Sequence, residues 1–235
     1  TSWLDPNLEF EGAVDGFVEA LFAPGSARFL ADVARLAREI ARPGLWNALS
    51  RTLVHLTAPG VPDLYQGDEL WSFALADPDN RRPVDFARRR EALAALDARD
   101  GDPGLVAELL ERPEDGRMKL HVVRSALRLR RAEPGLFAGA YEPLAAGGPA
   151  ARHVFAFVRR HGARSAITVV PRFARTLTRG PAPPLGAVWG ETSIPLPADI
   201  AGVRLTNVLT GETSRGPALR LSEALATCPV ALLVG

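Results

Sequence analysis

Residues 59–71 read PGVPDLYQGDELW, and residues 77–83 read DPDNRRP. Together these two runs hold five carboxylates, two adjacent arginines and two aromatic rings, in a short stretch punctuated by proline and glycine. They follow a region whose apolar spacing is helical, and an ordinary connector would be poorer in functional groups. The composition of the two runs therefore favours a recognition loop.

The overall composition indicates a globular chain. It has 235 residues, 47% of them hydrophobic, and a formal net charge of +1, which suffices for one large or two small domains. No apolar run approaches the about 20 residues of a membrane span, and the start at Thr1 lacks both Met and the layout of a signal peptide. We therefore expect a soluble, cytoplasmic protein without membrane association, and a start without Met fits a piece of a longer chain.

Cysteine and histidine usage bears on redox state and metal binding. Cys228 is the single cysteine, which excludes an internal disulfide framework, and the four histidines are scattered without a zinc-binding spacing. We expect no metal and no other cofactor.

Apolar residues recur at three- and four-residue steps in the first half of the chain, which predicts helices. Pro24 and Gly25 separate the first helix from the second, and Pro43 and Gly44 separate the second from the third. Residues 60–65 are expected to form a short, extended and buried segment. The helices are predicted over residues 12–22, 29–40, 45–55 and 117–131, with shorter charged pieces in 84–116 broken near Pro103 and Pro113.

The chain changes character after Glu133, Pro134 and Gly135. Short apolar stretches separated by Gly- and Pro-rich turns predict strands and a small antiparallel β-sandwich. The fold class is therefore α+β, with a domain boundary between residues 133 and 134. The strands are predicted over residues 154–158, 167–170, 194–196, 204–209, 219–221 and 230–234.

Two motifs resemble a known family. PGVPDLYQGDELW is similar to the eighth barrel strand and following turn of the α-amylase superfamily, and DPDNRRPVDF, residues 77–86, resembles the sugar-contacting loop beyond it. With further matches at TSWLDPN (residues 1–7), DGRMKL (residues 115–120) and RHVFAF (residues 152–157), the chain resembles the last part of the maltooligosyltrehalose synthases. The resemblance implies that residues 1–133 end a catalytic (β/α)8 barrel, with strand eight, its long loop and helix eight, and that residues 134–235 form a C-terminal β-sandwich domain.

The activity implied by this resemblance is isomerisation of the reducing-end α-1,4 bond of a maltooligosaccharide to an α,α-1,1 bond, through a covalent intermediate kept from water. The superfamily's three catalytic carboxylates follow barrel strands four, five and seven, before the part that this chain matches. Retaining chemistry needs two carboxyl groups about 5 Å apart, and the neighbours Asp68 and Glu69 point in opposite directions on an extended turn. We therefore assign no catalytic residue and expect no turnover by this chain alone.

Substrate contact is assigned to Asp77, Arg81, Tyr65, Trp71 and Glu69. Asp77 and Arg81 lie four residues apart and offer acceptors and forked donors for vicinal sugar hydroxyls, a role that the resemblance supports. They could equally form a salt bridge that shapes the loop, and both can hold at once. Tyr65 and Trp71 offer flat faces for sugar stacking, with burial as the competing interpretation. The alternative role for Glu69 is that of a structural hydrogen-bond acceptor at the turn.

The remaining tryptophans, Trp3, Trp46 and Trp189, are assigned to packing. Carboxylates interleave with the arginines of residues 81–90, which predicts a solvated face and no nucleic-acid binding.

The expected partners are a maltooligosaccharide and the missing N-terminal part of the barrel. An incomplete barrel would leave apolar helix faces uncovered, so we expect self-association or repacking of the helices against the sandwich. Three alternatives stay open: a non-catalytic carbohydrate-binding module, a structural or interaction domain, and part of a related amylase-family hydrolase.

Overall fold

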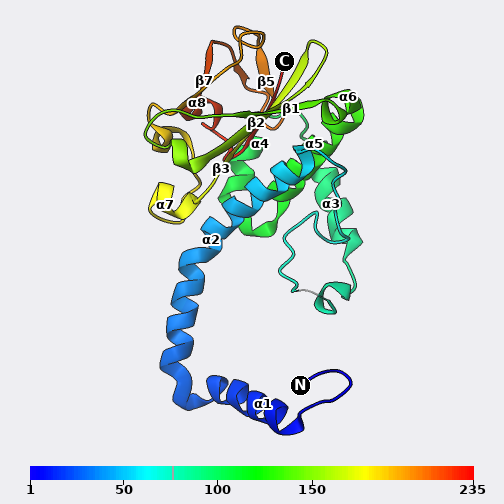
Figure 1. The fold of residues 1–235 in the computed structure, drawn as a ribbon, viewed down its shortest axis with the longest axis vertical. Helices are drawn as coiled ribbons and strands as arrows, with labels where there is room; N and C mark the ends of the chain where they lie inside the picture. The colour runs from blue at the N-terminus through cyan, green and yellow to red at the C-terminus, as the bar shows by residue number, and fades with distance from the viewer. Residues whose placement is uncertain (76) are drawn as a thin grey trace. The chain divides into compact units, whose positions relative to one another are not determined.

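The computed structural model describes residues 1–75 and 77–235. The chain divides into two compact units, Thr1–Ala41 and Arg42–Gly235, which are described separately below. The order of the elements along the chain can be followed in Figure 1. Among the described residues, every helix is too short or too polar to cross a membrane.

The first unit contains helix α1 (Leu8–Phe22), a short 3-10 turn η1 (Pro24–Ser26) and the beginning of helix α2 (Ala27–Thr57). Asn7 caps α1 by accepting a hydrogen bond from the backbone of Phe10 at 3.0 Å. Every residue of 1–41, a stretch that the structure describes in full, is exposed or half-buried. Trp3 is fully exposed, so its assignment to packing was wrong.

Helix α2 corrects the prediction of two helices separated at Pro43. Pro43 lies inside one continuous helix of 31 residues. A proline in a helix interior removes a hydrogen bond and costs about 3 kcal/mol, but the turns that follow it are fixed by the burial of Leu45, Trp46 and Leu49. Burial therefore overrides the local signal to stop.

The other predicted helices are confirmed. They are α3 (Phe86–Asp97), α4 (Leu105–Glu111) and α5 (Arg117–Ala132), and they are accompanied by η2 (Asp79–Arg81), η3 (Pro113–Asp115) and α6 (Pro134–Ala138).

Residues 61–65 do not form the expected buried segment. They have no regular secondary structure, Val61 is 95% exposed and Tyr65 is 45% exposed. A barrel strand is held extended and buried by hydrogen-bonded neighbours on both sides, and within residues 1–75 and 77–235 no strand pairs with this segment.

Among the described residues, all the strand pairs are antiparallel. A six-stranded sheet has the order β1-β2-β3-β8-β5-β6, and a separate ribbon pairs β4 with β7. In Figure 1, β1, β2 and β3 lie next to one another, as the register requires. The strands are β1 (Ala140–Leu144), β2 (Val154–His161), β3 (Arg164–Pro171), β4 (Ser193–Pro195), β5 (Leu205–Asn207), β6 (Thr213–Ser214), β7 (Ala218–Arg220) and β8 (Ala231–Val234).

Each of the six predicted strands is found, and β1 and β6 were missed. β1 is a mostly exposed edge strand that contains Pro143, and β6 has only two residues. Short helices η4 (Ala151–His153), α7 (Ala174–Thr178), η5 (Gly186–Trp189) and α8 (Leu221–Ala224) fill the connections. The expected mixture of helices and antiparallel sheet is confirmed.

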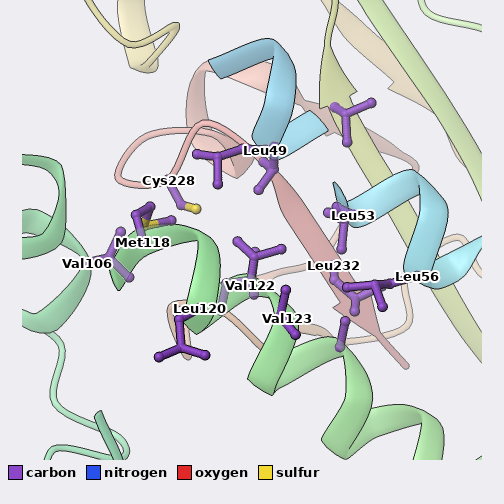
Figure 2. Packing of buried hydrophobic residues seen from close by; sticks show 14 of the residues in the cluster. Leu49, Leu53, Leu56, Val106, Met118, Leu120, Val122, Val123, Cys228 and Leu232 are labelled. Carbon is purple, nitrogen blue, oxygen red and sulfur yellow. The ribbon is translucent and has the colours of Figure 1, made fainter. Parts of the chain in front are cut away.

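Strand alternation divides the interior of the second unit into two cores. Ile167 and Val169 of β3 face the core that includes β4, β7 and Trp189, whereas Ala166 and Val170 face the core built with α2 and α5. Figure 2 shows this helical core, where Leu49, Leu53 and Leu56 of α2, residues of α5, Leu232 and Cys228 gather. The helical core thus draws residues from both sides of residue 133, and the domain division there stays a prediction.

Candidate functional site

The polar loop between α2 and α3 is anchored by Arg89. Glu69 accepts hydrogen bonds from Arg89 Nε at 2.9 Å and from the Gly67 backbone at 3.1 Å, and Arg89 also donates to the Gly67 carbonyl. Gly67 has φ +95°, and a Cβ there would lie 3.2 Å from Val84. Asp85 caps the start of α3 on the backbone of Arg88 at 2.9 Å. Glu69 thus acts as the structural acceptor that its position predicted.

Asp77 and Arg81 form an exposed ion pair within the loop. Arg81 Nε donates to Asp77 Oδ1 at 2.8 Å, and Arg81 Nη2 makes a second contact with Asp77 Oδ2. The side chain of Arg81 is 67% exposed and that of Asp77 is 56% exposed. The ion pair therefore links two residues of the loop, and both side chains remain accessible from solvent. Sugar contact by this pair stays a prediction.

Asp79 makes two further contacts within the same loop. It accepts a hydrogen bond from the Leu75 backbone at 2.8 Å and pairs with Arg82 at 2.6 Å. Arg82 itself is largely exposed. The ion pair with Asp79 gives Arg82 a structural role in the loop.

Trp71 is half-buried and fixed at its polar edge. The indole Nε1 donates to the Pro113 carbonyl at 2.7 Å, and Lys119 Nζ lies 5.7 Å from the centre of the ring. Trp71 lines a hollow of about 390 Å³ together with Phe73, Asp79, Asn80 and Arg82. Asn80 Oδ1 is buried and, within the part of the chain that the structure describes, has no hydrogen-bond partner.

The structure brings only some of the predicted residues together. Trp71 lines the hollow and Glu69 is tied to Arg89, which lines it too, whereas Asp77, Arg81 and Tyr65 lie outside it. Asp79 and Asn80 were missed as site residues. Both belong to the DPDNRRP run, so their polar side chains beside the predicted pair were the available signal.

A second, smaller hollow of about 200 Å³ shares no lining residue with the first and is lined by His55, Asp63, Asp68 and Lys119 among others. Lys119 is buried and donates to the Leu70 carbonyl at 3.0 Å. Burial lowers the pKa of Lys119 below its ordinary value, while the charge of Asp68 opposes this shift. Lys119 therefore ties α5 to the end of the polar run.

Comparison with known proteins gives a consistent result, although no protein-family model matches the sequence. The chain is 40% identical over 238 aligned residues to a Mycobacterium tuberculosis protein named as a maltooligosyl trehalose synthase. That alignment covers 100% of this chain and 26% of the relative. The chain thus spans about a quarter of the length of the curated relatives that it matches.

Solved structures agree. The maltooligosyltrehalose synthase from Arthrobacter ramosus superposes with a TM-score of 0.77 at 38% identity, covering 100% of this chain and 28% of that one. A glycosyltrehalose synthase gives a TM-score of 0.63 at 28% identity, covering 99% of this chain and 26% of that one. The resemblance to the maltooligosyltrehalose synthases is therefore confirmed along the whole of this chain, as a match to a part of those proteins.

Proposed function

We propose that this chain is the C-terminal portion of a maltooligosyltrehalose synthase, an isomerase that converts the reducing-end α-1,4 bond of maltooligosaccharides to an α,α-1,1 bond in the cytoplasm. The observation that carries the proposal is 40% identity over the full chain to a protein named for this activity. In this proposal residues 1–133 close a (β/α)8 barrel and residues 134–235 form its C-terminal β-sandwich domain.

The chain's role in the reaction is to bind and position sugar. The bidentate Asp77–Arg81 contact uses two of the five guanidinium N–H groups, so three donors remain for hydroxyl oxygens, and the Asp77 oxygens keep lone pairs for hydroxyl protons. Tyr65 and Trp71 offer ring faces for stacking, and Glu69 keeps the turn between them in shape. The nucleophile and the proton donor come from the part of the enzyme outside this chain.

Because the Asp77–Arg81 ion pair is exposed, its effect on sugar binding can be measured separately from its effect on folding stability. Exposed pairs contribute about 0–1 kcal/mol to folding, and both side chains are more than half exposed. Removing the pair should therefore weaken sugar binding without unfolding the protein.

The test is a calorimetric titration of the chain with maltopentaose. In a second measurement, the sugar is analysed by chromatography after long incubation with the chain. We expect weak binding, no trehalose-ended product, and at least tenfold weaker binding by Arg81→Gln with an unchanged melting temperature. The control is Arg35→Gln, because Arg35 forms a comparable exposed pair with Asp32 at 3.3 Å in the first unit.

Unchanged affinity in Arg81→Gln would remove this pair from the sugar site. Absence of any maltopentaose binding would favour a structural domain, and formation of a trehalose-ended product would contradict the assignment of catalysis to residues outside the chain.

A further inference from the structure

A hollow of about 430 Å³ lies within the second unit and shares no lining residue with the hollow beside Trp71. The segment after α2, the end of α5, helix α6 and strand β2 all contribute to it. Its lining includes Gly60, Val61, Arg130, Phe137, Gly139 and Arg159. Two arginines thus line one hollow.

Arg159 is buried, with 2% of its surface exposed. Its guanidinium donates to the backbone carbonyls of Phe137 and Gly139, the latter at 2.9 Å, and lies 3.4 Å from that of Thr57. Its Nε–H is buried and, among residues 1–75 and 77–235, meets no acceptor. An unpaired buried donor is costly and unusual in a folded protein.

Arg130 also contacts Phe137, through the ring of that residue. Its guanidinium carbon lies 4.6 Å from the centre of the Phe137 ring, and its donors reach the carbonyls of Leu56 at 2.9 Å and Gly60 at 3.2 Å. All these acceptors are neutral. Within the described part of the chain, neither Arg130 nor Arg159 has a carboxylate within ion-pair distance.

Two arginines on the same elements, in contrast, have carboxylate partners. Arg160, the next residue along β2, pairs with Glu142 at 3.1 Å and with Asp199. Arg124, two turns earlier on α5, pairs with Asp97 at 2.6 Å and Asp100 at 2.9 Å. Arg124 and Arg160 are therefore neutralised by carboxylates, whereas Arg130 and Arg159 donate to backbone carbonyls.

The electrostatics at the hollow favour an incoming anion. Burial lowers the pKa of Arg159, and the positive charge of Arg130 lowers it further; burial also lowers the pKa of Arg130. Two partly desolvated cations in one hollow raise each other's energy. An anion between them would relieve this repulsion and give the unpaired donor an acceptor.

We propose that the hollow around Arg130 and Arg159 binds a phosphate group, either as free inorganic phosphate or as part of a small phosphate ester. Guanidinium forks match the oxygens of phosphate, and the hollow falls within the size range of small-molecule sites. Neither Asp77 nor Arg81 lines this hollow, so the proposal does not depend on the proposed sugar binding.

The experiment is calorimetric titration and thermal melting of the 235-residue chain with inorganic phosphate and with glycerol 3-phosphate, at an ionic strength held constant with sodium chloride. We expect saturable binding and a raised melting temperature. Arg130→Gln should weaken binding about tenfold or more, because it removes a charge-assisted contact. The control is Arg220→Gln, which removes one positive charge from an exposed side chain elsewhere.

The two ligands distinguish the source of the phosphate. Tighter binding of glycerol 3-phosphate indicates a phosphate ester, and equal or weaker binding indicates free phosphate. As a second readout, the Arg159 Nε–H signal in the NMR spectrum should shift on adding phosphate to the unmodified chain and not to Arg130→Gln.

The proposal is overturned if phosphate stabilises the chain no more than chloride at equal ionic strength, or if Arg130→Gln binds as tightly as the unmodified chain. If Arg130→Gln does not fold by circular dichroism, Arg130→Lys replaces it, because lysine keeps the charge and loses the fork. Unchanged phosphate affinity in that variant would equally contradict the proposal.

Discussion

Helix α2 contains two regions with the same kind of sequence and opposite surroundings. Leu36, in the first unit, is 55% exposed, whereas Leu53, in the second, is fully buried. The apolar residues of 8–40 recur at helical spacing, as do those of α5, yet of these regions only α5 and the end of α2 contribute residues to a core. Periodicity thus specifies a helix and an apolar face. It does not specify which other segment packs against that face.

The difference fits the proposed origin of the chain. An isolated helix of about 15 residues is marginal in water, and large exposed apolar faces mark surfaces that bind another protein part. The curated relatives are longer, with this chain spanning 26% of their length. We propose that the rest of such an enzyme covers the apolar faces of residues 8–40.

The largest expected effect comes from truncating matched leucines in α2. Leu53→Ala should destabilise the protein by about 2–5 kcal/mol, because it opens a cavity in the core beside β3 and β8. Leu36→Ala, the matched control on the same helix, should change stability by less than about 0.5 kcal/mol. Urea unfolding followed by circular dichroism measures both.

Similar losses of stability in Leu53→Ala and Leu36→Ala would contradict the contrast between the two regions of α2, since they would place Leu36 in a cooperative core. A small loss for Leu53→Ala would show that the helical core does not hold the second unit together.

A smaller effect is expected from the pH dependence of the second unit. His121 is buried in α5, its Nε2 lies 2.8 Å from the Leu209 carbonyl, and burial lowers the pKa of its imidazole. The unfolded chain therefore binds a proton more readily than the folded one. Stability should fall as the pH drops below the unfolded pKa of about 6.5, and it should be fully present above it.

The measurement is urea unfolding of the unmodified chain and of His121→Gln at pH 7.5 and pH 5.5. The advantage of histidine over glutamine should shrink at the lower pH. An equal difference at both values, or a larger one at pH 5.5, would contradict a buried neutral His121.

Much of the fold could be predicted from the sequence because local patterns specify local structure. The helices at Phe86–Asp97 and Arg117–Ala132 and six of the strands follow from periodicity and turn residues. Pro43 misled the prediction because the tertiary burial of Trp46 and Leu49 outweighs a missing hydrogen bond. Residues 61–65 misled it because burial and extension depend on neighbouring strands, which no local pattern records.

The contacts of the candidate site likewise include some that the sequence predicts and some that it does not. The Asp77–Arg81 pair was predictable because four residues in one loop bring the groups together. The Glu69–Arg89 pair was not, because the two residues are 20 apart and Arg89 was placed on a solvated face among other arginines. The contacts of Arg159 with the carbonyls of Phe137 and Gly139, and of Arg130 with the Phe137 ring, depend on the packing of α6 against β2 and α5, so sequence alone gave no signal for that hollow.

Hydrogen exchange along α2, read by mass spectrometry, tests the central contrast most directly. The same helix crosses from residues with an uncovered apolar face to residues in a core, so exchange should change sharply near Pro43. We predict that the backbone amides of residues 46–57 exchange at least about a hundredfold more slowly than those of residues 28–40, since core opening costs several kcal/mol. Uniform slow exchange from residue 28 to residue 57 would contradict the account, because it would show that the first unit is already held as firmly as the core.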